Sequence, residues 1–595
     1  MMSKRNSFLV GKAFRAYLMA TVLTVAATQI ASLVDATLVG QLISAEALGA
    51  VNISKPVLQL TFSIGNLFII GGSILTGMAI GTGDREQANR LFTKCLIAVV
   101  VAGLLILSCG LIWFDEILGM LCNSDNLREM AGQYLQVTFI TMLPFLLSYM
   151  LETYVIVDGS PKLATIAVVI SNIANVVLDI TFISVFHWGV RGAATATLIM
   201  YVLSALILLW HFVRKKEGQK VLALDLGQEK GALGRMSMMG LPVTLTTFLI
   251  AVQIACCNIV AIEHLGDVGV VTFAVCIALL SFSMIFVSGT MRTIQPVGAI
   301  LKGIGDSKGV LLMMWQSYKF LLLSLAIYSA VILIFPDEVC ALFGVKDDFM
   351  SSIVADALPA FAMYIILEGL YSLLIPAYQF YDHNNLALFV ALSKALFPML
   401  GFWLMAIYCP EFAWWGFFMG MLLVIFILMP VTFHMQQKNV FLSPILLVPL
   451  PSKAEVFDLS IPADLSHIND ATDGLMEFLK DKELSTRAMN YSALCMEELI
   501  KNIAEHSGAH FIDIRAIVCN ATRIDIQKKV SISLHDDGKA FNPVEETNVA
   551  QPEEVEDKIG LALVHSISSD IRYEYLFNQN MVTIEVEDLK MHYYP

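Results

Sequence analysis

The chain has 595 residues, of which 57% are apolar, and its mean hydropathy is +0.72, which excludes an ordinary soluble protein at about 45–50% apolar. The net charge of −14 lies in residues 455–595, which contain 26 acidic and 12 basic residues, so the rest of the chain is neutral. An acidic C-terminal part excludes nucleic acid as a partner, because phosphate binding needs clustered lysine and arginine.

Long apolar runs with few charges predict a polytopic α-helical membrane protein of about twelve spans. Each run is long enough to cross about 30 Å of hydrocarbon as a helix. The first run is too long for a cleavable signal and is expected to remain as the first span. The expected spans lie near residues 14–40, 55–80, 92–114, 131–157, 163–186, 190–213, 239–262, 272–300, 315–335, 352–380, 387–408 and 414–436.

The distribution of basic residues predicts the orientation. With the N-terminus inside, the inner loops hold about eighteen lysines and arginines and the outer loops about four. An even number of spans then places both termini in the cytoplasm.

The apolar part repeats itself. Residues 81–84 (GTGD) recur as residues 303–306 (GIGD), and Pro144 with Glu152 recurs as Pro359 with Glu368. Parallel six-helix repeats are typical of transporters, with the transport path between the repeats. We therefore expect an N-terminal lobe at residues 1–213, a second lobe at 214–436, a proline-containing linker at 437–454 and a separate domain at 455–595.

Ionisable side chains inside the spans are candidate functional residues, because each costs several kcal/mol in lipid. The carboxylates are Asp35, Glu152, Asp179 and Glu368, and the basic residues are Arg292 and Lys394. A buried carboxylate disfavours its charged form, so it can take up and release a proton or small cation. The alternatives are a carboxylate that only bonds a neighbouring helix and, for Lys394, a side chain that reaches the inner surface. Asn175 lies four residues before Asp179, on the same helix face.

Six short segments of the bundle form an ordered set: residues 34–40 (VDATLVG), 47–50 (ALGA), 81–84 (GTGD), 158–162 (DGSPK), 175–179 (NVVLD) and 189–197 (GVRGAATAT). In this order they resemble the multidrug and toxic compound extrusion (MATE) family, over about residues 14–436. The resemblance implies two six-helix lobes in a V and export of small organic molecules driven by H⁺ or Na⁺. Its DinF-like branch implies a cation site at Asp35, Asn175, Asp179 and Thr197. Many members have a proline early in the first helix, which residues 14–40 lack.

From residue 455 the pattern changes to that of an α/β domain. Strands are expected near residues 455–459, 511–518, 522–526, 530–534, 571–575 and 581–586, and helices near 463–480, 485–505 and 560–568. A sheet covered by helices over about 140 residues is one ordinary domain.

Three motifs follow one another along this domain: residues 497–502 (EELIKN) with His506, residues 536–543 (DDGKAFNP), and residues 560–564 (GLALV). Together they resemble the GHKL ATPase α/β sandwich, in particular the anti-sigma-factor serine kinase branch.

The resemblance implies ATP and Mg²⁺ as cofactors. Asn502 would hold Mg²⁺, Asp536 would accept a hydrogen bond from adenine, and Gly538 would let the base approach. The remaining roles fall on Glu498 as a base, His506 near the phosphates, and Gly560 at a helix N-terminus that favours phosphate. Lys558 stands where the family usually has a glycine.

These patterns favour a cation-coupled exporter of the bacterial inner membrane with a cytoplasmic ATP-binding regulatory domain. Two alternatives stay open: a receptor whose tail is a serine kinase or partner-switching module acting on an anti-anti-sigma-like regulator, and a flippase for a lipid-linked substrate, with membrane lipid as partner. Whether the chain is an enzyme stays open with them.

Overall fold

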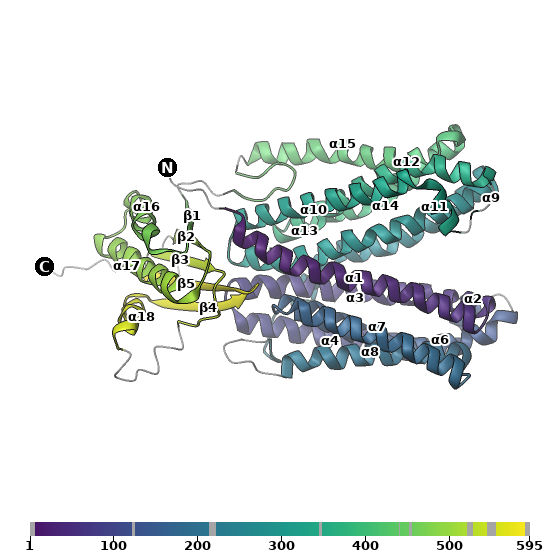
Figure 1. Ribbon diagram of the computed structural model, residues 1–595, viewed down its shortest axis with the longest axis horizontal. Helices are drawn as coiled ribbons and strands as arrows, with labels where there is room; N and C mark the ends of the chain where they lie inside the picture. Colours follow the sequence, from purple (N-terminus) through teal and green to yellow (C-terminus); the bar gives the residue numbers. More distant parts are fainter. Residues whose placement is uncertain are drawn as a thin grey trace.

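Figure 1 shows a long helical bundle with a small α/β domain, here called the tail, seated on one end. The computed structural model describes residues 6–121, 125–213, 222–343, 345, 348–439, 441–450, 455–519, 528–543 and 555–588. All structural statements below concern these residues.

The twelve expected spans are confirmed: among the described residues, twelve helices are long and apolar enough to cross a membrane. The first lobe consists of α1 (Phe8–Leu42), α2 (Ala45–Ile53), α3 (Lys55–Gly81), α4 (Arg85–Ile112), α5 (Phe114–Leu121), α6 (Asp125–Val157), α7 (Pro161–Ile180) and α8 (Gly189–Val213). The second consists of α9 (Ala232–Gly303), α10 (Ser307–Ile334), α11 (Pro336–Leu342), α12 (Asp348–Ser372), α13 (Leu374–Phe380), α14 (Asn384–Tyr408) and α15 (Trp415–Lys438). Helix α9 contains two spans that meet at Gly266, whose φ of 67° suits glycine.

The repeated GxGD motif is a turn that ends one helix and begins the next. Gly83 and Gly305 have φ values of 77° and 75°, which allow the sharp turn. The following aspartate caps the next helix: Asp84 accepts from the Gln87 amide at 2.9 Å, and Asp306 accepts from the Gly309 amide at 2.8 Å. The sequence repeat therefore marks two equivalent loops, one in each lobe.

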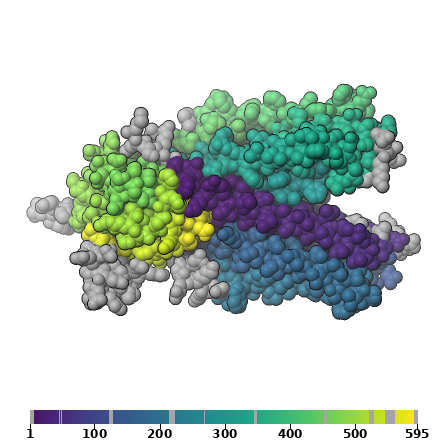
Figure 2. Space-filling model, viewed as in Figure 1, coloured from purple at the N-terminus to yellow at the C-terminus, as the bar shows by residue number. Residues whose placement is uncertain are grey.

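The lobes meet closely along α3 and α9. A side chain at Gly71 would overlap the carbonyl of Met236, and one at Gly81 would overlap that of Ile300. Gly81 and Gly303 face each other at the end of the bundle that carries the tail. Toward the opposite end the lobes separate, as the notch between purple and teal in Figure 2 shows.

The tail has one antiparallel sheet in the order β1-β2-β3-β5-β4. Its strands are β1 (Val456–Pro462), β2 (Phe511–Cys519), β3 (Lys529–Asp536), β4 (Asp570–Leu576) and β5 (Gln579–Glu587). Helices α16 (Ile468–Lys480), α17 (Thr486–Asn502) and α18 (Val555–Ile567) cover one face, and the other face is turned toward the bundle (Figure 1). The strand expected at residues 522–526 lies outside the described residues.

Alternation along the strands builds both faces of this sheet. Leu459, Ile514 and Leu534 are paired across the strands and buried under the helices. One register position along, a polar row runs across all five strands and faces the bundle. The row consists of Asp458, Arg515, Ser533, Thr583 and Arg572.

Part of the expected linker lies against the second lobe. Leu447 and Val448 are fully buried and belong to the apolar core of the bundle. The Tyr378 hydroxyl donates to the Ile445 carbonyl at 2.7 Å. Residues 441–450 are therefore held on the lobe, and residues 440 and 451–454 lie outside the described part.

Candidate functional site

The first lobe contains a cavity of about 350 Å³ that collects polar residues from five helices. Asp35 of α1, Glu152 of α6, Asn175 of α7, Thr197 of α8 and Arg292 of α9 all line it. The structure thus brings together three of the four residues that the MATE resemblance assigned to a cation site. Two further candidates from the spans, Glu152 and Arg292, line the same cavity.

The fourth residue, Asp179, lies next to this cavity. It is fully buried on α7, and its carboxylate is close enough to that of Asp35 to interact with it. Among the described residues, one oxygen of Asp35 and both oxygens of Asp179 have no hydrogen-bond donor. A turn of π-helix, Thr181–Val185, follows at once, a local distortion that is frequent at functional sites. Two facing carboxylates without donors are a suitable place for a proton or a small cation.

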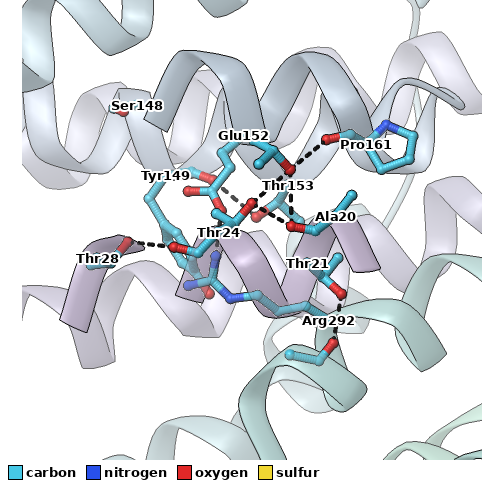
Figure 3. A network of polar contacts seen from close by, with 12 residues as sticks. Ala20, Thr21, Thr24, Thr28, Ser148, Tyr149, Glu152, Thr153, Pro161 and Arg292 are labelled. Atoms are coloured by element: carbon cyan, nitrogen blue, oxygen red, sulfur yellow. Dashed lines mark hydrogen bonds and ion pairs between the residues drawn. The ribbon is translucent and has the colours of Figure 1, made fainter. Parts of the chain in front are cut away.

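Glu152 has a different environment from Asp35. It forms an ion pair with Arg292, which comes from the other lobe, and the Arg292 guanidinium lies 5.6 Å from the Tyr149 ring centroid. Figure 3 shows Glu152, Tyr149 and Arg292 gathered beside Thr21 and Thr24 of α1. The pair therefore joins α6 to α9 across the lobe boundary.

Glu368 does not line this cavity. It pairs with Lys394 within the second lobe at 2.5 Å, and Ser372 bridges them, accepting from Lys394 at 2.7 Å and donating to Glu368 at 3.1 Å. Glu152 and Glu368, which occupy matching positions in the repeat, are thus both ion-paired, but only Glu152 lines the cavity.

Aromatic side chains form much of the remaining cavity wall, and sequence reasoning missed them. They are Phe62, Tyr134, Phe145, Tyr149 and Tyr201. Their apolar rings resemble the surroundings of any span, so only their placement on helices that face one cavity reveals them. Aromatic faces beside carboxylates favour organic cations.

In the tail, a second cavity of about 220 Å³ lies between α17, α18 and the end of β3. Asn502, His506 and Asp536 line it, together with Lys539 and Phe541. Asn502 ends α17 and is followed by a second π-helical turn, Ile503–Ser507, which carries His506. Three of the expected nucleotide-site residues therefore share one pocket.

A hydrogen-bond network fixes Asp536. Its carboxylate accepts from the Gly538 amide and from Asn580 Nδ2, both at 2.9 Å. Burial raises the pKa of Asp536, and these two donors oppose the rise. Asn580, which sequence reasoning missed, also lines the pocket and accepts from the Tyr573 hydroxyl at 2.9 Å.

The pocket fits an adenine nucleotide. A side chain at Gly538 would overlap Ser507, and Asn502 Nδ2 is buried with no partner among the described residues. A bound nucleotide would supply the phosphates that hold Mg²⁺ together with Asn502, since Mg²⁺ takes few protein ligands. Glu498 lies against Gly560, so the expected base faces the expected phosphate segment.

One expectation for this pocket is wrong. Helix α18 begins at Val555, so Gly560 lies inside the helix rather than at its first turn. The apolar run from Gly560 marked only the C-terminal part of this helix, in which Leu561 and Val564 are buried. Lys558 lies on α18, and its side chain is outside the described part.

Fold and sites together define a multi-pass membrane protein with a fused nucleotide-pocket domain. Residues 20–181 match the MatE family model, and residues 461–586 match the histidine kinase-like ATPase domain model. The chain therefore carries a MatE domain in its N-terminal region and a histidine kinase-like ATPase domain in its C-terminal region.

Similar proteins agree with this assignment. The multidrug export protein MepA of Staphylococcus haemolyticus (strain JCSC1435) is 23% identical over 259 residues, 44% of this chain and 57% of that protein. MepA of Staphylococcus aureus (strain MRSA252) is 22% identical over the same length. The match thus spans little more than half of these relatives.

Solved structures share the bundle fold. An outward-facing multidrug resistance MATE family transporter has a TM-score of 0.66 at 20% identity, covering 72% of this chain and 97% of its own. A MOP superfamily transporter from Pyrococcus furiosus has a TM-score of 0.65 at 20% identity, with the same coverage. The fold of the bundle is the MATE fold.

Proposed function

We propose that the chain is an antiporter that exports small organic molecules across the bacterial inner membrane in exchange for H⁺ or Na⁺. The observation that carries this proposal is the first-lobe cavity, which Asp35 lines together with Asn175 and Thr197. Beside the cavity Asp35 faces the buried Asp179, and among the described residues one oxygen of Asp35 and both oxygens of Asp179 have no hydrogen-bond donor. A cation that enters there neutralises a charge pair that is otherwise repulsive and desolvated.

The exchange follows from competition. Asp35 lines the cavity wall together with Tyr149 and Tyr201, so an organic substrate and a cation both contact it. Cation binding at Asp35 and Asp179 removes the negative charge that retains a cationic substrate. Since α1 carries Asp35 and α7 carries Asp179, cation binding also draws these two helices together. Glu152 forms an ion pair with Arg292 and thereby holds α6 of the first lobe against α9 of the second.

In this proposal the tail regulates transport by binding nucleotide and does not supply the energy for it. Its pocket places Asn502, His506 and Asp536 together, which suits ATP with Mg²⁺. The cation gradient drives transport, and the tail senses nucleotide from the cytoplasmic side.

The test is Asp35→Asn, which removes the charge and keeps the size. In vesicles with an imposed cation gradient, we expect gradient-driven movement of ethidium, a planar organic cation, to fall to background while folding is retained. The matched control is Asp115→Asn, an exposed acidic residue of the short helix α5. Normal gradient-driven transport by Asp35→Asn would refute the cation site.

A further inference from the structure

The cytoplasmic ends of α3 and α9 are held by a single surface of the tail. Thr82 and Ile304 are the C-terminal cap residues of these helices, at equivalent positions of the sequence repeat. Arg572 of β4 donates to the Thr82 carbonyl at 3.1 Å. Arg515 of β2 donates to the carbonyls of Ile304 at 3.2 Å and Gly305 at 2.5 Å. A cation at a helix C-terminus satisfies open carbonyls and the negative end of the helix dipole.

Ion pairs reinforce this contact, and all put the base on the bundle and the acid on the tail. Lys308 pairs with Asp458 at 2.8 Å, and Arg85 pairs with Glu574 at 2.6 Å. The former joins the second lobe to β1, and the latter joins the first lobe to β4. The basic inner loops that set the membrane orientation thus also receive the acidic tail.

A hairpin of the tail is inserted into the bundle. The turn from β4 to β5 places Phe577 at 4% exposure, with its ring 5.2 Å from that of Tyr17. Phe577 and Asn578 have φ values of 60° and 56°, the left-handed region of a type I′ turn, which disfavours a bulky residue such as phenylalanine. The strained turn has phenylalanine where asparagine or glycine would suit the backbone better, and the contact with Tyr17 offsets this strain.

We propose that the polar face of the tail's sheet is a clamp that holds the two lobes together at their cytoplasmic ends. The sheet is continuous from β1 to β4, so Arg515 and Arg572 sit at a fixed spacing. Opening the cytoplasmic side would separate the loops at residues 82–85 and 304–308. The sheet must then release at least one of them, so the docked tail favours the state that is closed toward the cytoplasm.

The clamp is connected to the nucleotide pocket at two points. Asp537, which follows Asp536, accepts from Lys12 of α1 at 2.6 Å and from the His510 amide at 2.8 Å. Asn580 binds Asp536, and its neighbour Gln579 donates to the Leu9 carbonyl of α1 at 2.7 Å. Docking therefore fixes the 536–538 loop in place before nucleotide arrives. Pre-ordering of a binding loop strengthens binding, and the coupling is reciprocal, so nucleotide tightens the clamp.

The clamp is tested by amide hydrogen exchange on the full chain in lipid nanodiscs. The clamp rests on the transporter proposed above, and only its link to nucleotide rests on the proposed nucleotide site. Amide exchange needs neither transport nor nucleotide, so it tests the clamp separately from both proposals. We expect the double variant Arg515→Ala/Arg572→Ala to speed exchange in residues 78–84 and 300–306 at least about fivefold. The matched control is Arg235→Ala, a cytoplasmic arginine that pairs with Glu229 instead. Unchanged exchange in the double variant would overturn the clamp.

A second variant distinguishes loss of docking from misfolding of the tail. Phe577→Asn suits the turn backbone and removes the contact with Tyr17, so it should loosen the same two segments while exchange in β3 and β5 stays slow. If the two segments stay as protected as in the unchanged chain, the inserted hairpin does not support docking and the clamp is wrong.

The link to nucleotide is tested by binding of a non-hydrolysable ATP analogue with Mg²⁺. Lys12 lies outside the pocket, yet we expect Lys12→Met to weaken binding about fivefold or more. The matched control, Arg15→Met, removes an exposed base of the same helix that bonds only its own helix carbonyl among the described contacts. Equal affinities for Lys12→Met and the unchanged chain would overturn the link. No binding by the unchanged chain would instead refute the proposed nucleotide site and leave the exchange result to judge the clamp.

Discussion

At the scale of single residues, the carboxylates of the membrane region are of two kinds, those with a basic partner and those without one. Glu152 and Glu368 each have a basic partner, whereas Asp35 and Asp179 face each other. The charge of an ion-paired carboxylate is already neutralised, so such a residue serves to connect helices. Two carboxylates that face each other without a basic partner are stabilised most when a cation binds between them. The difference supports the proposal that Glu152 joins the two lobes and that Asp35 takes part in cation exchange.

The pair of Glu152 and Arg292 leads to a first prediction. Arg292→Gln should lower the unfolding temperature strongly, because it leaves a buried carboxylate uncompensated, a loss of roughly 3–5 kcal/mol. Adding Glu152→Gln should restore much of the loss, since no buried charge then remains. Thermal unfolding of the two single variants and the double variant in detergent gives the coupling. Additive losses would show that the two side chains do not stabilise each other.

Asp537 gives a prediction for pH. Burial alone would raise the pKa of Asp537, but the Lys12 and His510 bonds lower it to about 2. A lowered pKa means that the contribution to stability is complete above the unfolded value of 3.8 and disappears only as pH falls toward 2.

His510 and Lys12 face this carboxylate, so the imidazole is first removed with His510→Gln. In that background, Asp537→Asn should lower the unfolding temperature equally at about pH 5 and about pH 8. A loss that fades between these two values would mean that the carboxylate titrates near neutrality.

At the scale of elements, the helices were predictable because lipid imposes a length and a composition on them. The observed helices extend beyond the expected runs, as α4 does by beginning at Arg85, because helix ends continue into water with charged residues. The strands of the tail followed from alternation. The cavity around Asp35 followed from the family resemblance, whereas Arg292 arrives from the other lobe and no local pattern places it there.

The glycines between α3 and α9 give a prediction at this scale. Gly71→Ala should destabilise the bundle by about 1–3 kcal/mol, because the added methyl group overlaps the Met236 carbonyl. Gly234→Ala, on α9 where a methyl group meets nothing within 4 Å, is the matched control and should be neutral or slightly stabilising. Thermal unfolding compares them. Equal behaviour of the two variants would mean that the helices are not in close contact.

At the scale of the whole molecule, the acidic tail and the neutral bundle are one assembly. The sequence indicated two separate parts joined by a linker, and nothing local in it indicated that they dock. Docking depends on residues hundreds of positions apart, such as Lys12 and Asp537, and on a polar strand face that in an isolated domain would simply face water. The repeat in the bundle could be seen in the sequence, but the sequence did not indicate that the tail binds both copies of the repeated loop.

The most direct test of the exporter is transport of ethidium by the full chain in sealed vesicles, with imposed proton or sodium gradients and with or without ATP. We expect one of the two gradients to drive ethidium against its own gradient without ATP, and ATP alone to drive none. With the gradient present, ATP should slow transport, because nucleotide tightens the clamp. Ethidium movement driven by ATP with no ion gradient would contradict the account.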